Sequence, residues 1–200
     1  MDDLKRRKQK NIVDFSLVKS EKKIKGKKKP LKKLEFYIIL IASALVFGFA
    51  FVTFMYQTVT MKGPSMQGTI EDEDVVVVSK MRKFIKGVHV NDVIAVKRSK
   101  DTYYSIKRVV AKPGDSVQII GGKLYVNDEL QEKFKDQIIV NPGNASNKIV
   151  LEKNQFYVLG DNVNNSDDSR FPAVGIVQKT DITGIVIYKL SPKEHKGKVK

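Results

Sequence analysis

Residues 36–56 read FYIILIASALVFGFAFVTFMY, and no charged side chain interrupts them. As an α-helix this stretch would be about 31 Å long, close to the ~30 Å thickness of the hydrocarbon core of a bilayer. Phe36, Tyr37 and Tyr56 stand at its ends, and aromatic side chains gather at membrane interfaces. We therefore predict one transmembrane helix over residues 34–57.

Two other interpretations of this stretch are weaker. A buried helix of a soluble protein would need apolar cover on every side, which a domain of this size could hardly supply. A cleaved signal peptide has a shorter apolar core, and its basic segment is far shorter than the one that precedes this stretch.

The segment in front of the apolar stretch carries most of the charge. The 200 residues have a formal net charge of +15, and residues 1–33 contribute +10 of it, from fourteen basic and four acidic side chains. A segment so rich in lysine and poor in apolar residues is expected to be a disordered polybasic tail. The positive-inside rule places this tail in the cytoplasm, on anionic lipid, and residues 58–191 outside. Without interleaved aromatic residues to stack on bases, the tail is not expected to bind nucleic acid.

Beyond residue 58 the sequence changes to short apolar runs separated by turn residues, which is typical of β-strands. Candidate strands cover 75–78, 92–96, 103–110, 117–120, 123–126, 155–159 and 182–190. Nothing here has a long helical period. We predict a mainly β domain of folded antiparallel sheets, small and barrel-like, behind one N-terminal transmembrane helix. Residues 128–149 read as an irregular excursion and residues 192–200 as a polar, frayed C-terminal tail.

The composition excludes several kinds of chemistry. The chain has no cysteine, which removes disulfides, thiolate metal sites and cysteine nucleophiles. Its two histidines, His89 and His195, are too few for a multi-histidine metal site. Both read as surface residues, so a serine–histidine triad is not favoured.

Three segments concentrate polar residues within the strand-like pattern: 61–70, 105–115 and 160–170. Each alone has an ordinary interpretation. The first is a Gly-Pro-Ser loop, the second holds lysine on the solvated face of a strand, and the third is a surface turn that could also hold calcium.

In this order the segments resemble the bacterial type I signal peptidases, membrane-anchored serine proteases that remove signal peptides from secreted proteins. The resemblance runs from the apolar stretch to about Leu190. Its strongest parts are Ser65-Met66-x-x-Thr69, Lys107-Arg108-Val109-Val110-x-x-Pro113-Gly114-Asp115 and Gly160-Asp161-Asn162-x-Asn164-Asn165-Ser166-x-Asp168-Ser169-Arg170.

The resemblance implies a catalytic dyad, with Ser65 as nucleophile and Lys107 as general base. A free lysine amine, with a pKa near ~10.4, is mostly protonated at neutral pH and cannot accept a proton. Burial disfavours the charged form, so we expect Lys107 to be desolvated. Because successive residues of a strand point to opposite faces, Lys107 and Arg108 should point in opposite directions.

The resemblance also implies roles for neighbouring residues. Ser166 would hydrogen-bond the Lys107 amine, Asp168 would pair with Arg170, and Asp161 is a candidate partner for Arg108. These contacts would hold the flexible lysine side chain in one direction.

The resemblance places four further residues at the oxyanion site and the substrate pocket: Gly63, Met66, Thr69 and Ile106. The Ser65 N–H would be one oxyanion donor, while Gly63 has no hydroxyl to supply a second. Two positions depart from the common pattern: Gly68 stands where many members have proline, and Val163 where many have arginine. Neither departure touches the dyad, so we expect activity, with a looser site or altered substrate range as a secondary outcome.

The sequence therefore predicts a membrane-bound serine endopeptidase that cleaves N-terminal signal peptides from translocated preproteins. The resemblance implies small residues at the first and third positions before the cut, and no metal or organic cofactor. The main alternative is a non-catalytic homologue that acts as a membrane-anchored binding or assembly factor. A lipid or nucleic-acid binder would explain the tail but not the three ordered motifs. The sequence leaves the oligomeric state open.

Overall fold

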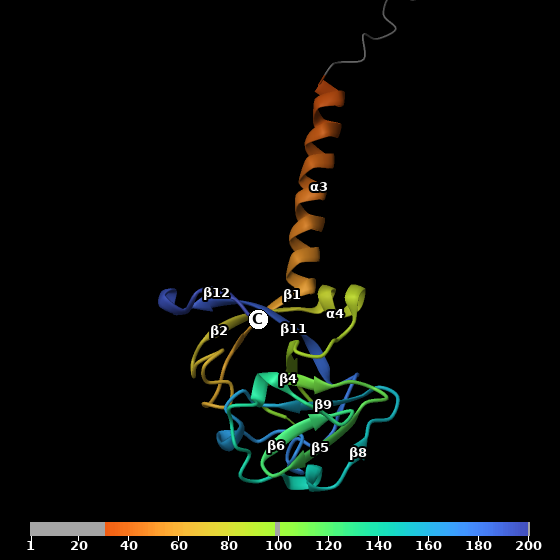
Figure 1. Cartoon of the computed structure of the whole chain (residues 1–200). Helices are drawn as coiled ribbons and strands as arrows, with labels where there is room; N and C mark the ends of the chain where they lie inside the picture. The colour runs from red at the N-terminus through yellow and green to blue at the C-terminus, as the bar shows by residue number, and fades with distance from the viewer. Residues whose placement is uncertain (1–30, 99–100, 200) are drawn as a thin grey trace, which may run out of the picture. The chain divides into compact units, whose positions relative to one another are not determined.

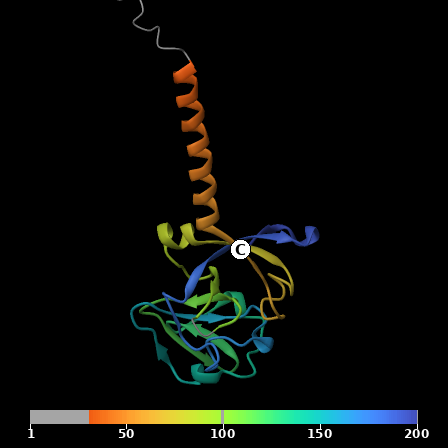
Figure 2. The same ribbon diagram turned by 180° about the vertical axis from the view of Figure 1, so that it is seen from behind.

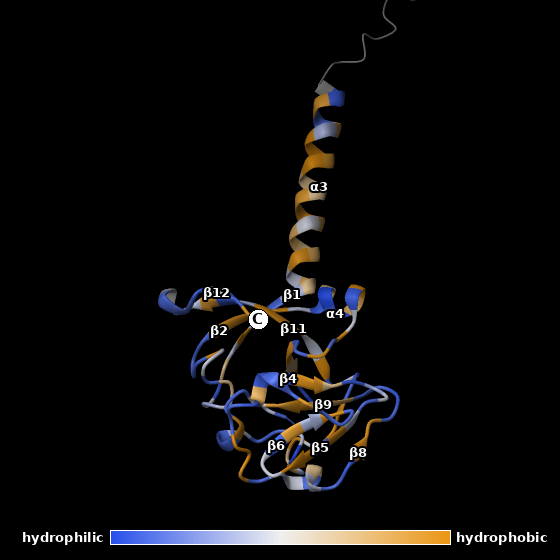
Figure 3. Ribbon diagram, in the orientation of Figure 1, coloured by the Kyte–Doolittle hydropathy of each residue, from blue (hydrophilic) through white to orange (hydrophobic). Residues whose placement is uncertain are grey.

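The computed structural model describes residues 31–98 and 101–199, so most of the predicted polybasic tail lies outside the described residues. The chain divides into two compact units, residues 1–50 and 51–200 (Figure 1). Helix α3 (Leu31–Met55) begins in the first unit. Within the described residues, Lys32–Met55 is the one helix long and apolar enough to cross a membrane, and none of its most apolar window is buried. Figure 3 shows apolar residues along most of this helix.

The ends of this helix differ from the predicted 34–57. The helix begins at Leu31, and it stops at Met55 because Tyr56 begins the first strand, β1 (Tyr56–Thr60). This strand pairs with β2 (Val75–Ser79), and Val59 is buried in the core of the second unit. Strand pairing and burial thus override the continuation of the helix.

The second unit is built from two antiparallel sheets, seen from opposite sides in Figures 1 and 2. The eight-stranded sheet has the order β1-β2-β11-β3-β4-β9-β10, with β12 paired to β11, and the four-stranded sheet has the order β7-β6-β5-β8. The remaining strands are β3 (Val93–Val96), β4 (Ser105–Ala111), β5 (Ser116–Ile120), β6 (Lys123–Val126), β7 (Glu129–Leu130), β8 (Ile149–Val150), β9 (Gln155–Leu159), β10 (Val177–Gln178), β11 (Ile182–Ser191) and β12 (Gly197–Lys198). The predicted fold, a mainly β antiparallel domain behind one apolar helix, is confirmed.

Strand β4 carries Lys107 and Arg108. It pairs with β3 on one edge and with β9 on the other, and its residues 106–111 are all buried. Both faces of the strand contact apolar clusters, so a polar side chain at residues 106–111 is largely withdrawn from water whichever way it points.

The helical pieces of the second unit are short. Helix α4 (Lys80–Lys86) follows β2 directly, is capped by the Ser79 hydroxyl and ends at Gly87. The other pieces are 3₁₀ turns: η2 (Glu132–Phe134), η3 (Gly143–Ser146), η4 (Val163–Asn165) and η5 (Lys193–His195). The excursion 128–149 consists of β7, η2, η3 and the start of β8, and it buries Phe134, Ile139 and Ala145 against the β5–β6 hairpin.

The C-terminal segment is not the frayed tail that the sequence predicted. Within its described part, which ends at residue 199, β12 pairs with Tyr188 and Lys189 of β11, and His195 Nδ1 lies 2.9 Å from Asp74 Oδ1. The prediction failed because backbone pairing and a polar contact hold this segment, and neither leaves an apolar pattern in the sequence.

Candidate active site

Ser65 lies in the turns between β1 and β2. The N–H of Gln67 donates to the Pro64 carbonyl at 3.0 Å, and the N–H of Ile70 donates to the Met66 carbonyl at 2.9 Å. The side chains of Met66 and Ile70 are fully buried in the apolar cluster below. These anchors hold Ser65 at the edge of the core, where 8% of the residue remains exposed.

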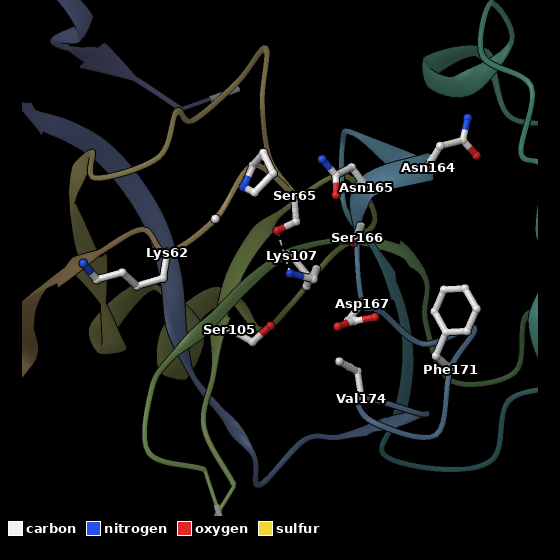
Figure 4. Close-up of a pocket in the computed structure, with 12 residues that line it drawn as sticks. Lys62, Ser65, Ser105, Lys107, Asn164, Asn165, Ser166, Asp167, Phe171 and Val174 are labelled. Atoms are coloured by element: carbon white, nitrogen blue, oxygen red, sulfur yellow. Dashed lines mark hydrogen bonds between the residues drawn. The ribbon is translucent and has the colours of Figure 1, made fainter.

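Lys107 reaches Ser65 from strand β4. Its Nζ donates to Ser65 Oγ at 2.8 Å and to the Ile106 carbonyl at 3.1 Å, and only 5% of the residue is exposed. Figure 4 shows this contact at the centre of the site. When the amine is neutral, the same separation allows the Ser65 hydroxyl to donate its proton to Nζ, as general-base catalysis requires.

Burial lowers the pKa of Lys107 to about 8, because the charged ammonium loses its hydration between the sheet and the turn. Asp168 and Asp167 act in the opposite direction and favour the protonated form. A group with this pKa is neutral in roughly a tenth of the molecules at pH 7, far more often than an exposed lysine.

Arg108, the next residue of β4, points away from Lys107 as strand alternation predicts. Its guanidinium forms two hydrogen bonds to Asp161, at 2.7 Å from Nε and 2.6 Å from Nη2, and a third to the Asn91 carbonyl. The Thr69 hydroxyl also donates to Asp161, at 2.5 Å. Burial would raise the pKa of Asp161, but Arg108 and Thr69, with Lys133 nearby, hold it below its ordinary value. Asp161 thus ties the Ser65 turn to the strand that carries Lys107.

A second buried ion pair closes the loop after β9. Arg170 donates to Asp168 from Nε and from Nη2, both at 2.8 Å, and the two side chains are almost fully buried. Asp168 also accepts from the Gly160 N–H at 3.2 Å, and Arg170 donates to the Asn141 and Val163 carbonyls. Asp161 and Asp168 of this segment are each paired with an arginine, so these two carboxylates are not arranged as calcium ligands. Within residues 31–98 and 101–199 no group of three or more acidic or histidine side chains could hold a metal ion.

Two residues of the third segment have structural roles that the sequence did not assign. A Cβ atom at Gly160 would lie 2.4 Å from the Ser65 carbonyl oxygen and 2.3 Å from Ser166 Oγ, so only glycine fits there. The Asn162 N–H donates to the Ser65 carbonyl at 3.1 Å, and its side chain donates to the Pro64 carbonyl. The sequence marks these two residues by their place in the Gly160-Asp161-Asn162 motif. Only the folded chain shows that this motif contacts the Ser65 turn and holds it in place.

The dyad opens into a pocket of about 480 Å³ (Figure 4). It is lined by Lys62, Gly63, Pro64, Ser65, Ser105, Lys107, Asn164, Asn165, Ser166, Asp167, Phe171 and Val174. Substrate could therefore reach the buried amine from this side. Within the described residues the Ser65 N–H makes no hydrogen bond, which leaves it free to donate to an oxyanion, whereas the Gly63 N–H is bound to Asp72.

The match to known proteins agrees with this geometry. A family model described as "Signal peptidase, peptidase S26" matches residues 34–190. The chain belongs to this family of signal peptidases. It is thus a serine endopeptidase by class, and its apolar N-terminal helix together with its relatives indicates anchoring in a membrane.

Curated relatives of the peptidase span most of its length. Signal peptidase I U of Bacillus subtilis (strain 168) is 29% identical over 167 residues, which cover 79% of this chain and 87% of the relative. Signal peptidase IB of Staphylococcus aureus (strain N315) is 31% identical over 179 residues, 80% of this chain and 91% of the relative. A crystal structure of a signal peptidase I from Enterococcus faecalis V583 aligns with a TM-score of 0.40 and 23% identity, over 49% of this chain and 95% of that one.

The expected contact between Ser166 and Lys107 is not present in the peptidase. Lys107 Nζ is directed to Ser65 and to the Ile106 carbonyl, and Ser166 Oγ is buried without a hydrogen-bond partner among the described residues. The hydroxyl instead packs toward Gly160. Ser166 still lines the pocket near Lys107, but its hydroxyl does not bind the Lys107 amine.

Three residues expected at the oxyanion site or the pocket lie elsewhere. Met66 and Ile106 are fully buried in the apolar cluster under the Ser65 turn, because strand and turn geometry direct their side chains into the core. Thr69 is bound to Asp161. Of the four residues named for these roles, Gly63 lines the pocket.

The two departures from the common pattern have local explanations. Gly68 has a φ of +93°, and its N–H donates to Glu71 at 3.0 Å, so proline, which has neither this φ nor an N–H, could not replace it here. Val163 is buried in the apolar cluster beside the β5–β6 hairpin, where it needs no charge partner.

The pKa of Lys107 predicts how activity depends on pH. The protonated amine dominates below the pKa and cannot act as a base, so kcat/KM should rise with pH and reach half its maximum near pH 8. The measurement is kcat/KM for a short peptide substrate between pH 6 and pH 11. A midpoint near the 10.5 of an exposed lysine would contradict this assignment.

Proposed function

We propose that this chain cleaves N-terminal signal peptides from translocated preproteins, with Ser65 as nucleophile and Lys107 as general base. The observation that carries the proposal is the 2.8 Å contact between Lys107 Nζ and Ser65 Oγ, made by a buried amine with a lowered pKa beside an open pocket. The family match to the signal peptidases supports the choice of substrate.

The geometry supports a two-step mechanism. The neutral amine of Lys107 takes the proton from Ser65 as Oγ attacks the carbonyl carbon of the scissile bond, and the Ser65 N–H donates to the developing oxyanion. Lys107 then returns the proton to the leaving amine of the mature chain, and the signal peptide stays as an ester on Ser65. A water then gives a proton to Lys107 as it attacks the ester carbonyl carbon, and Lys107 passes that proton to Ser65 Oγ as the ester bond breaks, which releases the signal peptide as a carboxylic acid and restores the enzyme.

Neither histidine competes for the role of base. The side chain of His89 is largely exposed and its Nδ1 lies 3.8 Å from Asp92, while His195 contacts Asp74. Lys107 is the basic side chain that contacts Ser65. The proposed chemistry uses no metal and no organic cofactor.

The proposal includes the placement of the chain in the membrane. Residues 1–33 would face the cytoplasm and contact anionic lipid, residues 34–57 would cross the bilayer, and residues 58–191 would form the extracytoplasmic peptidase domain. The charge of the tail supports this orientation, since it holds fourteen of the 37 basic residues. Protease added to intact spheroplasts should digest residues 58–191, and protection of them would contradict the orientation.

The function is tested by processing of a model preprotein by the full-length chain in liposomes. Wild-type protein should release the mature protein, with an N-terminus that follows small residues at the first and third positions before the cut. A preprotein with phenylalanine at the first position is the matched control and should stay uncut. Failure of the folded wild-type protein on several preproteins would favour the non-catalytic homologue.

A further inference from the structure

Of the residues that the structure describes, Asp167 is the one acidic side chain that lines the pocket beside the dyad. Its neighbour Asp168 is fully buried and paired with Arg170, whereas Asp167 is exposed. Within residues 31–98 and 101–199, Asp167 makes no hydrogen bond and no ion pair. In Figure 4 its carboxylate points into the space that also holds the Lys107 amine and Ser105.

Among residues 31–98 and 101–199, the other charges beside this space are paired or directed away from it. Asp168 is paired with Arg170, and on the far face of β4 Asp161 is paired with Arg108. Lys62 lines the opposite wall, with its amine directed away from the dyad (Figure 4). Once Lys107 is in its neutral, working form, Asp167 presents an uncompensated negative charge to the substrate.

We propose that Asp167 forms a subsite for a lysine or arginine side chain of the preprotein, next to the scissile bond. The inference rests on the proposed function. The resemblance to the signal peptidases implies small residues at the first and third positions before the cut. The basic residue therefore belongs at the second position before the cut or at one of the first two positions after it.

The subsite is coupled to the dyad through the same carboxylate. Burial lowers the pKa of Lys107, and Asp168 and Asp167 both oppose this effect by favouring its protonated form; of the two, Asp167 is the one that lines the pocket. An ammonium or guanidinium that pairs with Asp167 cancels the effect of its carboxylate and makes Lys107 a base in more of the molecules at a given pH. A basic substrate should thus be cut faster, and its rate should reach half-maximum at lower pH than that of a neutral substrate.

The test uses the full-length chain in detergent and peptides with lysine, glutamine or glutamate at each of the three positions. At one of these three positions, the kcat/KM of wild type should be highest for the lysine peptide, lower for glutamine and lowest for glutamate. Each difference in kcat/KM should be about two- to fivefold, the range of an exposed charge pair. The preference should shrink in high salt. It should vanish in Asp167→Asn and reverse in Asp167→Lys, while Asp136→Asn, an exposed acid outside the pocket, keeps the wild-type ranking.

The outcomes separate this inference from the proposed function. Equal rankings in wild type and Asp167→Asn at all three positions would overturn the subsite while cleavage itself stands. Cleavage of the glutamine peptides by Asp167→Asn shows that the variant folds, so a lost preference then belongs to the carboxylate. If wild type cuts none of the peptides, both the subsite and the proposed function fall.

Discussion

Ser65→Ala and Lys107→Ala should each lower the rate of preprotein cleavage by about 10⁴-fold or more, because each removes a reacting group. Lys107→Arg should be as inactive as Lys107→Ala, since a guanidinium stays protonated and cannot take the serine proton. The double variant should be no slower than either single variant, because the two groups act as a unit. The measurement is single-turnover cleavage of a model preprotein.

Matched variants separate catalysis from folding in this experiment. Lys112→Ala removes an exposed lysine in the turn after β4 and should cleave at the wild-type rate. Lys107→Met keeps the length of the side chain and removes the amine, so it should be inactive yet at least as stable as wild type at pH 7. Normal cleavage by Ser65→Ala would show that the dyad assignment is wrong.

The lowered pKa of Lys107 makes the stability difference between wild type and Lys107→Met depend on pH. The folded-state pKa of about 8 lies below the 10.5 of an exposed lysine, so folding disfavours the charged amine. Below pH 8 the amine is charged in the folded and the unfolded protein, so the full free-energy cost of burying the charge lowers the stability of the folded protein. That cost is relieved as the pH rises from 8 to 10.5. Wild type should therefore gain stability relative to Lys107→Met across this window.

Asp168→Ala should lower the free energy of unfolding by about 3–5 kcal/mol, because it leaves the guanidinium of Arg170 buried without its counter-charge. Arg170 is 2% exposed and Asp168 is not exposed at all, so water cannot replace the lost partner. A loss of this size is a large part of the ~5–15 kcal/mol that stabilises a typical domain.

Lys148→Ala is the control for this second experiment. Lys148 pairs with Asp128 at 2.7 Å, but both side chains are exposed, so the loss of this pair should cost less than about 1 kcal/mol. Urea unfolding of the full-length chain in detergent can be followed by tyrosine emission, since the chain has seven tyrosines and no tryptophan. Equal destabilisation by the two variants would mean that burial does not set the strength of the Asp168–Arg170 pair.

Local patterns account for the parts of the fold that the sequence predicted. Strand alternation alone placed Lys107 and Arg108 on opposite faces, and they contact Ser65 and Asp161 respectively. The short strands β1, β7, β8, β10 and β12 escaped prediction because their hydrogen-bond partners, and not their composition, make them strands. Helix α4 escaped because its seven residues are too few to show a period.

The sequence by itself determined the apolar helix and the mainly β domain and predicted the residues of the proposed dyad, because length, charge, alternation and ordered motifs are properties of the chain. The tertiary structure decided what those residues meet. The Lys107–Ser65 contact joins positions 42 residues apart, and the Thr69–Asp161 contact joins positions 92 apart. Packing likewise sets the pKa of Lys107, because it determines which groups exclude water from the amine. Packing also leaves the Ser166 hydroxyl without a partner among the described residues and exposes the Asp167 carboxylate at the pocket. No linear pattern records that exclusion, because it arises only when distant segments pack together.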